Sequence, residues 1–119
     1  MAHLFVYGSL VDPRCLDEVL GHRFAGERLR ARLEGFERVM TERYAYPFLV
    51  SEPTRSVDGI LVMDVTPAEL AALDRYEDVD AGVYERIAVE VEAWSCGPRP
   101  IRLTAHTYVA GTQLRSTVS

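Results

Sequence analysis

Two segments in the last third of the chain alternate between apolar and polar side chains. The apolar positions are mainly the odd-numbered ones, both in residues 87–93 and in residues 101–109. A period of two predicts strands that bury one face and expose the other. The intervening Cys96-Gly97-Pro98-Arg99-Pro100 is rich in turn-forming residues. The two segments are therefore predicted to form a long hairpin.

Four further strands are predicted earlier in the chain. They cover residues 3–7, 29–40, 48–51 and 57–65. The first is a mainly apolar run, and the second begins as an alternation of apolar residues with arginines. Glu52-Pro53-Thr54-Arg55 is expected to turn the chain between the last two. Gly59 indicates a bulge or a close backbone contact within the last strand.

The segment "TERYAYP" (residues 41–47) is predicted as an aromatic loop. Tyr44 and Tyr46 have two interpretations. They either pack within the loop or line a pocket beside Pro47.

Two helices are indicated by their end signals. Asp12 can cap a helix with Pro13 at its first position, and Gly21 should end it. Thr66 can cap the second helix, and Glu69 completes a capping box three residues later. The second helix should run to residue 76 or 77.

The order of these elements predicts an α+β fold. A helix follows the first strand, four strands come next, and a second helix precedes the final hairpin. This order lacks a regular βαβ repeat, so we expect a curled, mostly antiparallel sheet flanked by two helices. The chain of 119 residues is expected to form a single domain over residues 1–119, with a core over residues 3–110 and a polar tail over residues 111–119.

Composition and charge narrow the classes of function. The net charge of −5 and the absence of a basic run argue against a nucleic-acid surface. The chain has no lysine, which excludes a Schiff-base lysine nucleophile. It also lacks an apolar run long enough to span a bilayer. Cys15 and Cys96 are expected to be free thiols, and we expect a cytoplasmic protein with no membrane partner.

Glu77 is the most informative position in the second helix. At about 100° per residue, Glu77 returns to within about 20° of Leu70, on the face that Leu73 would dock against the core. Burial, the like charges of Asp74 and Asp78, and the negative end of a helix would all raise the pKa of this carboxyl. Such a group is suited to proton transfer near neutral pH. The alternative is a frayed last turn that leaves Glu77 in water.

Other candidate sites have weaker support. The acidic residues after Asp74 do not have the spacing of a calcium loop. The three histidines are scattered, so we expect no zinc site and no metal or other cofactor. Ser9 lies in no nucleophile-elbow motif, and no histidine near Cys15 in the sequence supports a cysteine nucleophile.

A Gly-Ser pair directly after the first predicted strand is a second marked feature. "YGSL" (residues 7–10) leads from a strand into a helix, where backbone N–H groups often bind an anionic ligand. It is not a phosphate-binding P-loop, because the second glycine and the lysine of that motif are absent.

Taken together, these features resemble the γ-glutamylcyclotransferase-like, or AIG2-like, family. The matching segments are "FVYGSL" (5–10), "YPFLV" (46–50), "VDGILVMDV" (57–65), "LDRYED" (73–78) and "YERIAVEV" (84–91). They occur in the family's order and cover nearly the whole chain. The resemblance implies a small mixed β-barrel with helices packed outside it.

The resemblance also implies residue roles. Tyr7, Gly8, Ser9 and Leu10 would form the turn that binds the γ-glutamyl group through backbone amides, and Glu77 would be the catalytic acid/base. A late tyrosine often lines the family's pocket; Tyr108 is the candidate and Tyr84 its rival. The family usually has glycine where this chain has Asp78, which changes either the local backbone or the charge beside Glu77.

The implied function is that of an enzyme acting on a small-molecule γ-glutamyl substrate. The α-amine would attack the γ-carbonyl, closing 5-oxoproline and releasing an amine or amino acid. Two alternatives stay open: a non-catalytic ligand-binding or interaction domain on the same fold, and a biosynthetic enzyme that deprotects a γ-glutamyl amine by the same chemistry. The sequence leaves the leaving amine and the oligomeric state open.

Overall fold

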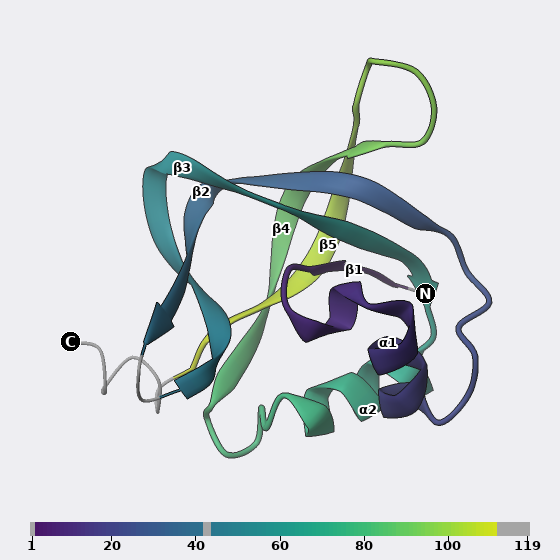
Figure 1. The fold of residues 1–119 in the computed structure, drawn as a ribbon, viewed down its shortest axis with the longest axis vertical. Coiled ribbons are helices and arrows are strands. Elements are labelled where there is room, and N and C mark those ends of the chain that lie inside the picture. The colour runs from purple at the N-terminus through teal and green to yellow at the C-terminus, as the bar shows by residue number, and fades with distance from the viewer. Residues whose placement is uncertain (1, 42–43, 112–119) are drawn as a thin grey trace.

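The computed structural model describes residues 2–41 and 44–111, and these form a closed five-stranded barrel with two α-helices (Figure 1). The elements are β1 (Ala2–Val6), the 3-10 helix η1 (Ser9–Val11), α1 (Pro13–Leu20), β2 (Arg28–Thr41), β3 (Tyr44–Val65), α2 (Pro67–Tyr76), β4 (Tyr84–Trp94) and β5 (Ile101–Ala110). The strand order is β1-β3-β2-β4-β5. The predicted α+β, mostly antiparallel barrel is confirmed.

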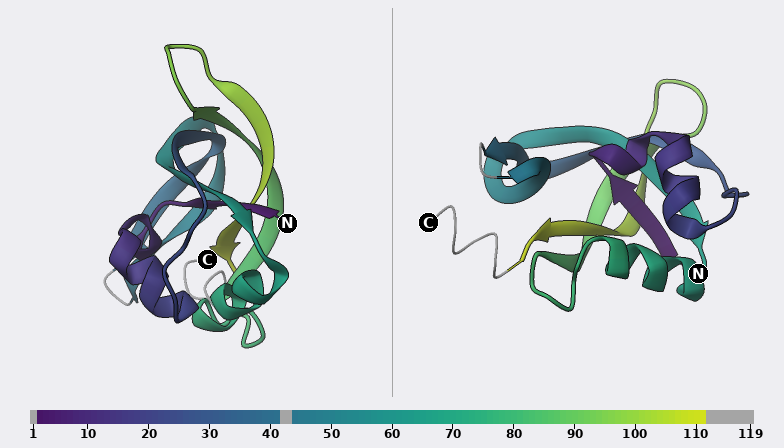
Figure 2. Two further views of the ribbon diagram at one scale, coloured as in Figure 1. Left: turned by 90° about the vertical axis from the view of Figure 1, so that its right-hand side faces the viewer. Right: turned by 60° about the horizontal axis from the view of Figure 1, so that its bottom comes forward.

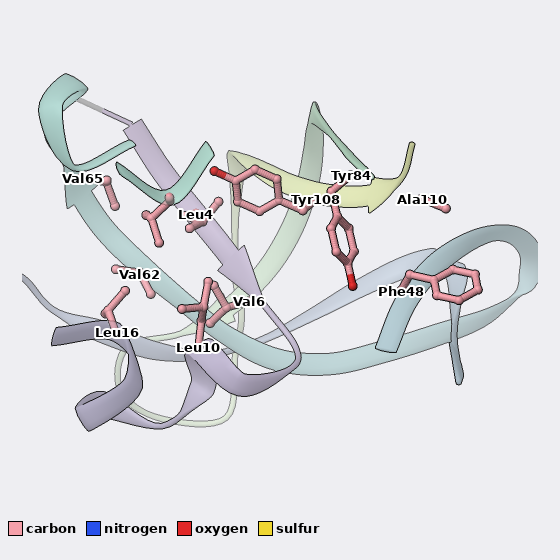
Figure 3. Close-up of a cluster of buried hydrophobic side chains, with 11 residues drawn as sticks. Leu4, Val6, Leu10, Leu16, Phe48, Val62, Val65, Tyr84, Tyr108 and Ala110 are labelled. Atoms are coloured by element: carbon pink, nitrogen blue, oxygen red, sulfur yellow. The ribbon is translucent and has the colours of Figure 1, made fainter. Parts of the chain in front are cut away.

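Strand β1 closes the barrel and is buried on both faces. It pairs antiparallel with β3 and parallel with β5, where Leu4 lies opposite His106. Phe5 joins the cluster of buried side chains that fills the barrel. Leu4 and Val6 belong to a second cluster, which includes side chains from both α-helices (Figure 3). Burial on both sides explains why this strand reads as a continuous apolar run.

Both helices begin and end at the predicted signals. The Asp12 carboxylate accepts a hydrogen bond from the Arg14 N–H at 2.9 Å, and Gly21 ends α1 in the left-handed conformation with φ 78°. Thr66 and Glu69 form the reciprocal capping box of α2. The helices pack side by side at one end of the barrel, away from the β4–β5 turn (Figures 1 and 2).

The prediction of a loop over residues 41–47 is wrong for the residues that the structure describes, 41 and 44–47, because they lie in strands. Thr41 is the last residue of β2 and pairs with Tyr44, the first residue of β3. Threonine and aromatic residues favour strands, so the ladder extends almost to the tip of the hairpin. Residues 42–43 and the side chains of Tyr44 and Tyr46 lie outside the described part of the chain.

The turn predicted at residues 52–55 is also wrong, because β3 continues through it. Phe36 pairs with Ser51 and Glu34 with Ser56, so residues 52–55 form a bulge opposite Gly35. The Glu52 carboxylate accepts hydrogen bonds from the Thr54 N–H and hydroxyl at 3.3 and 2.9 Å. The local turn chemistry is therefore present, but it bends a strand instead of ending it.

Gly59 makes the close backbone contact that the sequence predicts. A Cβ atom there would lie 2.2 Å from the carbonyl oxygen of Val6 and 2.8 Å from the ring of Phe5. Only glycine therefore allows β3 to approach β1 so closely at this point. The contact holds the end of β1 where the chain turns into η1.

The long C-terminal hairpin is confirmed. Strands β4 and β5 pair antiparallel from Tyr84 opposite Ala110 to Ala93 opposite Ile101. Among the described residues, no helix has both the length and the apolar character needed to cross a membrane.

Candidate functional site

A cavity of about 310 Å³ lies where the end of β1, the end of α2 and the start of β4 meet. Its described lining consists of Phe5, Val6, Tyr7, Gly8, Ser9, Leu10, Pro47, Tyr76, Glu77, Asp78, Val83, Tyr84 and Tyr108. All of the predicted site residues are in this set. The floor is buried and aromatic or aliphatic, whereas Ser9, Tyr76 and Asp78 are exposed at the rim. The structure thus brings the Gly-Ser turn and the predicted acid/base together.

The turn after β1 lines this cavity and carries backbone N–H groups that its short helix does not use. The short helix η1 uses the N–H groups of Val11 and Asp12, which donate to the carbonyls of Gly8 and Ser9 at 3.1 and 3.2 Å. In the described part of the chain, the N–H groups of Gly8, Ser9 and Leu10 donate none of the backbone hydrogen bonds formed in turns, loops and helix caps. Unsatisfied N–H groups at the start of a helical turn are suited to an anionic group.

Gly8 keeps the turn close to the opposite wall of the cavity. A Cβ atom on Gly8 would lie 3.1 Å from Cγ of Pro47, a contact tighter than side chains ordinarily make. A larger residue would therefore push the turn and Pro47 apart. This packing explains a glycine here more directly than a requirement for special backbone angles.

Glu77 caps the C-terminal end of α2 and is half-buried in the cavity wall. Its N–H donates to the carbonyl of Leu73 at 2.9 Å, which fixes the backbone in the last helical turn. Burial, and after it the charge of Asp78, raises the pKa of the Glu77 carboxyl to about 7. The inward orientation is therefore the interpretation that the structure supports.

Asp78 has a left-handed backbone, with φ 52°. Glycine adopts this conformation without cost, and aspartate is among the few other residues that tolerate it. Asp78 therefore adopts a backbone conformation that suits glycine, while it adds a negative charge beside Glu77. The Asp78 carboxylate is exposed at the rim of the cavity.

Three tyrosines shape the cavity, and each directs its hydroxyl to a protein acceptor. Tyr7 donates to the carbonyl of Tyr108 at 2.6 Å, Tyr108 to the Asp74 carboxylate at 2.7 Å, and Tyr84 to the carbonyl of Pro47 at 2.8 Å. Burial is the main cause that raises the pKa of Tyr7 and of Tyr108, so both phenols stay neutral. The structure places both Tyr108 and its rival Tyr84 in the wall.

Asp74 differs from what the sequence predicts. It was expected to repel Glu77, but its carboxylate is paired with the Arg86 guanidinium at 2.9 and 3.2 Å and also accepts the Tyr108 hydroxyl. Arg86 thus balances this charge from β4. The network ties α2 to β4 and β5 behind the cavity, and no local sequence signal could reveal it because the partners come from separate elements.

Tyr76 is a rim residue that the sequence analysis missed. Its hydroxyl lies 3.2 Å from the Ser9 hydroxyl, joining the end of α2 to the turn after β1. The residue directly precedes Glu77, so its position on a helix end beside an inward carboxylate was the available signal. This bond bridges the two segments that carry the candidate chemistry.

Within residues 2–41 and 44–111, no group of three or more histidine, cysteine, aspartate or glutamate side chains is arranged to hold a metal ion. Of the described lining residues, Glu77 has a carboxyl whose pKa is raised to about 7, and the turn at residues 8–10 lines the same cavity.

Curated relatives match 66–76% of this chain, and this chain spans 34–57% of their length. AIG2-like protein C from Arabidopsis thaliana is 36% identical over 88 residues, or 74% of this chain and 48% of that protein. A Methanocaldococcus jannaschii protein described as a gamma-glutamylcyclotransferase and putative RNase is 30% identical over 78 residues, or 66% of this chain and 34% of that protein.

Solved structures share the fold. A solution structure from Arabidopsis thaliana superposes with a TM-score of 0.76 at 30% identity, covering 92% of this chain and 68% of that chain. A structure named gamma-glutamyl cyclotransferase superposes with a TM-score of 0.72 at 19% identity, covering 92% of this chain and 66% of that chain.

The family described as "Gamma-glutamyl cyclotransferase, AIG2-like" has a model that matches residues 4–118. This match spans the turn after β1, the end of α2 and the hairpin that together surround the cavity. The protein therefore belongs to the γ-glutamyl cyclotransferase, AIG2-like family.

Proposed function

We propose that this protein converts a γ-glutamyl amine or γ-glutamyl amino acid into 5-oxoproline and a free amine or amino acid. The observation that carries the proposal is the Glu77 carboxyl, with a pKa of about 7, in one cavity with the N–H groups of residues 8–10. The cavity has the size of a small-molecule site. Family membership supports the reaction class.

The reaction is an intramolecular aminolysis. The substrate's α-amine nitrogen bonds to its own γ-carbonyl carbon, and the amide bond from that carbon to the leaving nitrogen breaks. The α-ammonium loses one proton before attack, and the attacking nitrogen loses a second as the lactam forms. One proton is delivered to the leaving nitrogen as its bond breaks, and the other ends on the released amine, which becomes an ammonium. A carboxyl that titrates near pH 7 is suited to both transfers, so Glu77 acts first as base and then as acid.

The other contribution is the shape and polarity of the site. A γ-glutamyl chain must fold back on itself to bring amine and carbonyl together, and a buried aromatic floor favours one compact conformation. The open N–H groups of residues 8–10 bind either the α-carboxylate or the oxyanion that develops on the γ-carbonyl. Tyr7 and Tyr108 contribute ring surface, since their hydroxyls are bonded to protein acceptors.

The test is 5-oxoproline release from γ-glutamyl amides and dipeptides by the wild type and by Glu77→Gln. Glutamine keeps the size of the side chain but takes up no proton, so turnover should fall by about 100- to 10,000-fold. Calorimetry with the same compounds should show that the variant still binds them. Unchanged turnover in Glu77→Gln would refute the role of Glu77. Binding without any turnover by the wild type would identify a binding domain instead.

A further inference from the structure

The mouth of the cavity carries a negative charge that the proposed reaction does not use. Among the described lining residues, Glu77 and Asp78 are the charged ones, and both are acidic. Glu77 is assigned to proton transfer. Asp78 therefore gives the rim a carboxylate with no assigned part in the chemistry.

The backbone of Asp78 is fixed although its side chain is exposed. The Asp78 N–H donates to the carbonyl of Arg75, and its carbonyl accepts from the N–H groups of Ala81 and Val83, each at 3.2 Å. In the described part of the chain, its carboxylate has no hydrogen-bond or ion-pair partner. A rigid turn therefore holds this exposed residue at the mouth of the cavity, where its charge acts on Glu77.

The orientation of a substrate follows from burial, provided that the proposed function holds. The γ-glutamyl group must reach the N–H groups of Gly8 and Leu10 and fold against the buried floor. Its scissile amide then lies at Glu77, and the leaving amine extends outward past the exposed rim. Asp78, adjacent to Glu77 in the chain, lies beside that exit.

We propose that Asp78 makes the site selective for γ-glutamyl amides whose leaving amine carries a second positive charge, as in the amide of a diamine. The cation lies against the carboxylate at the rim, whereas a leaving group with its own carboxylate is repelled. Arg38 is the opposing influence, because its charge acts on Tyr7 and would favour an anionic leaving group. Asp78 is closer to the reacting amide in this arrangement, since it directly follows Glu77.

The experiment compares kcat/KM for three matched substrates: the γ-glutamyl amides of diaminobutane, of butylamine and of aminobutyric acid. The wild type should prefer the cationic over the neutral amide by about two- to five-fold, the range expected for an exposed ion pair, and the anionic amide should be slowest. The preference should shrink as ionic strength rises. Asparagine tolerates the left-handed backbone, so Asp78→Asn should abolish the preference for the cationic amide without disturbing the turn. The ratio between substrates is the readout because a changed Glu77 affects all three alike.

Two results would overturn the inference while leaving the proposed function standing. One is equal turnover of the three amides by the wild type, and the other is a charge preference that survives in Asp78→Asn. If no amide yields 5-oxoproline, the proposed function fails, and selectivity is then read from dissociation constants of the three amides with the wild type and Asp78→Asn. The inference would also be overturned if the wild type did not bind the cationic amide more tightly than the neutral and anionic ones, or if Asp78→Asn kept the same order of affinities.

Discussion

Helix α2 carries two glutamates in opposite electrostatic environments. Glu69, in its first turn, is 9% exposed, yet its pKa is lowered. Burial alone would raise that pKa, but the Thr66 N–H at 2.9 Å and His22 Nε2 at 2.8 Å hold the carboxylate, and their effect is larger. Glu77 follows the last turn, where burial and Asp78 raise its pKa to about 7.

The difference shows that burial does not by itself decide the charge of a carboxyl. Glu69 meets N–H donors at the positive end of a helix dipole, and Glu77 meets a like charge at the negative end. The first arrangement stabilises the fold, and the second suits the proton transfer that we propose for Glu77. One helix would thus separate a structural role from a proposed chemical one by the position of each residue along its axis.

The largest expected difference between the two glutamates is in 5-oxoproline release, measured after each one is neutralised in turn. Glu77→Gln should lose about 100- to 10,000-fold in turnover, whereas Glu69→Gln should stay within about three-fold of the wild type, because it only caps a helix. Circular dichroism controls for the fold of both variants. A large loss in Glu69→Gln with a native spectrum would contradict the division of roles.

The same two variants should change stability in opposite directions. Because the folded pKa of Glu77 lies above its ordinary 4.5, the folded state binds protons more tightly, and stability is lost as pH rises from about 4.5 to 7. At about pH 8, Glu77→Gln should therefore raise the free energy of unfolding by about 1–3 kcal/mol, with no gain below about pH 4.5.

Glu69→Gln should instead lower the free energy of unfolding by less than about 1 kcal/mol at neutral pH, because it weakens the contact with His22 and loses the dipole interaction but keeps an acceptor for the cap. The lowered pKa of Glu69 means that this contribution is lost as pH falls below its ordinary range. Urea titrations of both variants over this range of pH provide the measurement. If both variants changed the free energy of unfolding in the same direction at about pH 8, the contrast between the two glutamates would be wrong.

The smallest effect concerns the charge next to Glu77. With Glu77 as base, kcat/KM of the wild type should rise with pH through about 7. Asp78→Asn removes the adjacent like charge, while Asp74 stays balanced by Arg86, so the midpoint should move to lower pH. The midpoint is measured from kcat/KM as a function of pH, with a neutral γ-glutamyl amide as substrate. A midpoint that moves upward would show that Asp78 does not act through its charge.

Features set by local chemistry could be predicted from the sequence. The caps of both helices, the β4–β5 hairpin, the close contact at Gly59 and the inward Glu77 all follow from short-range patterns. The bulge at residues 52–55 could not be predicted, because a partner strand decides whether turn-forming residues end a ladder or only bend it. The Asp74–Arg86–Tyr108 network was missed for a related reason: its members come from three elements that meet only in the folded protein.

The closure of the barrel by β1 also bears on when the site comes into existence. The Tyr7 hydroxyl and the Phe5 carbonyl both bond to β5, to partners 101 and 102 residues away in the chain. Contacts so distant in sequence carry a large loop-closure cost and form slowly. A nascent chain must therefore keep this apolar strand unpaired on one side until β5 emerges, so the turn at Gly8 is synthesised well before it can become competent.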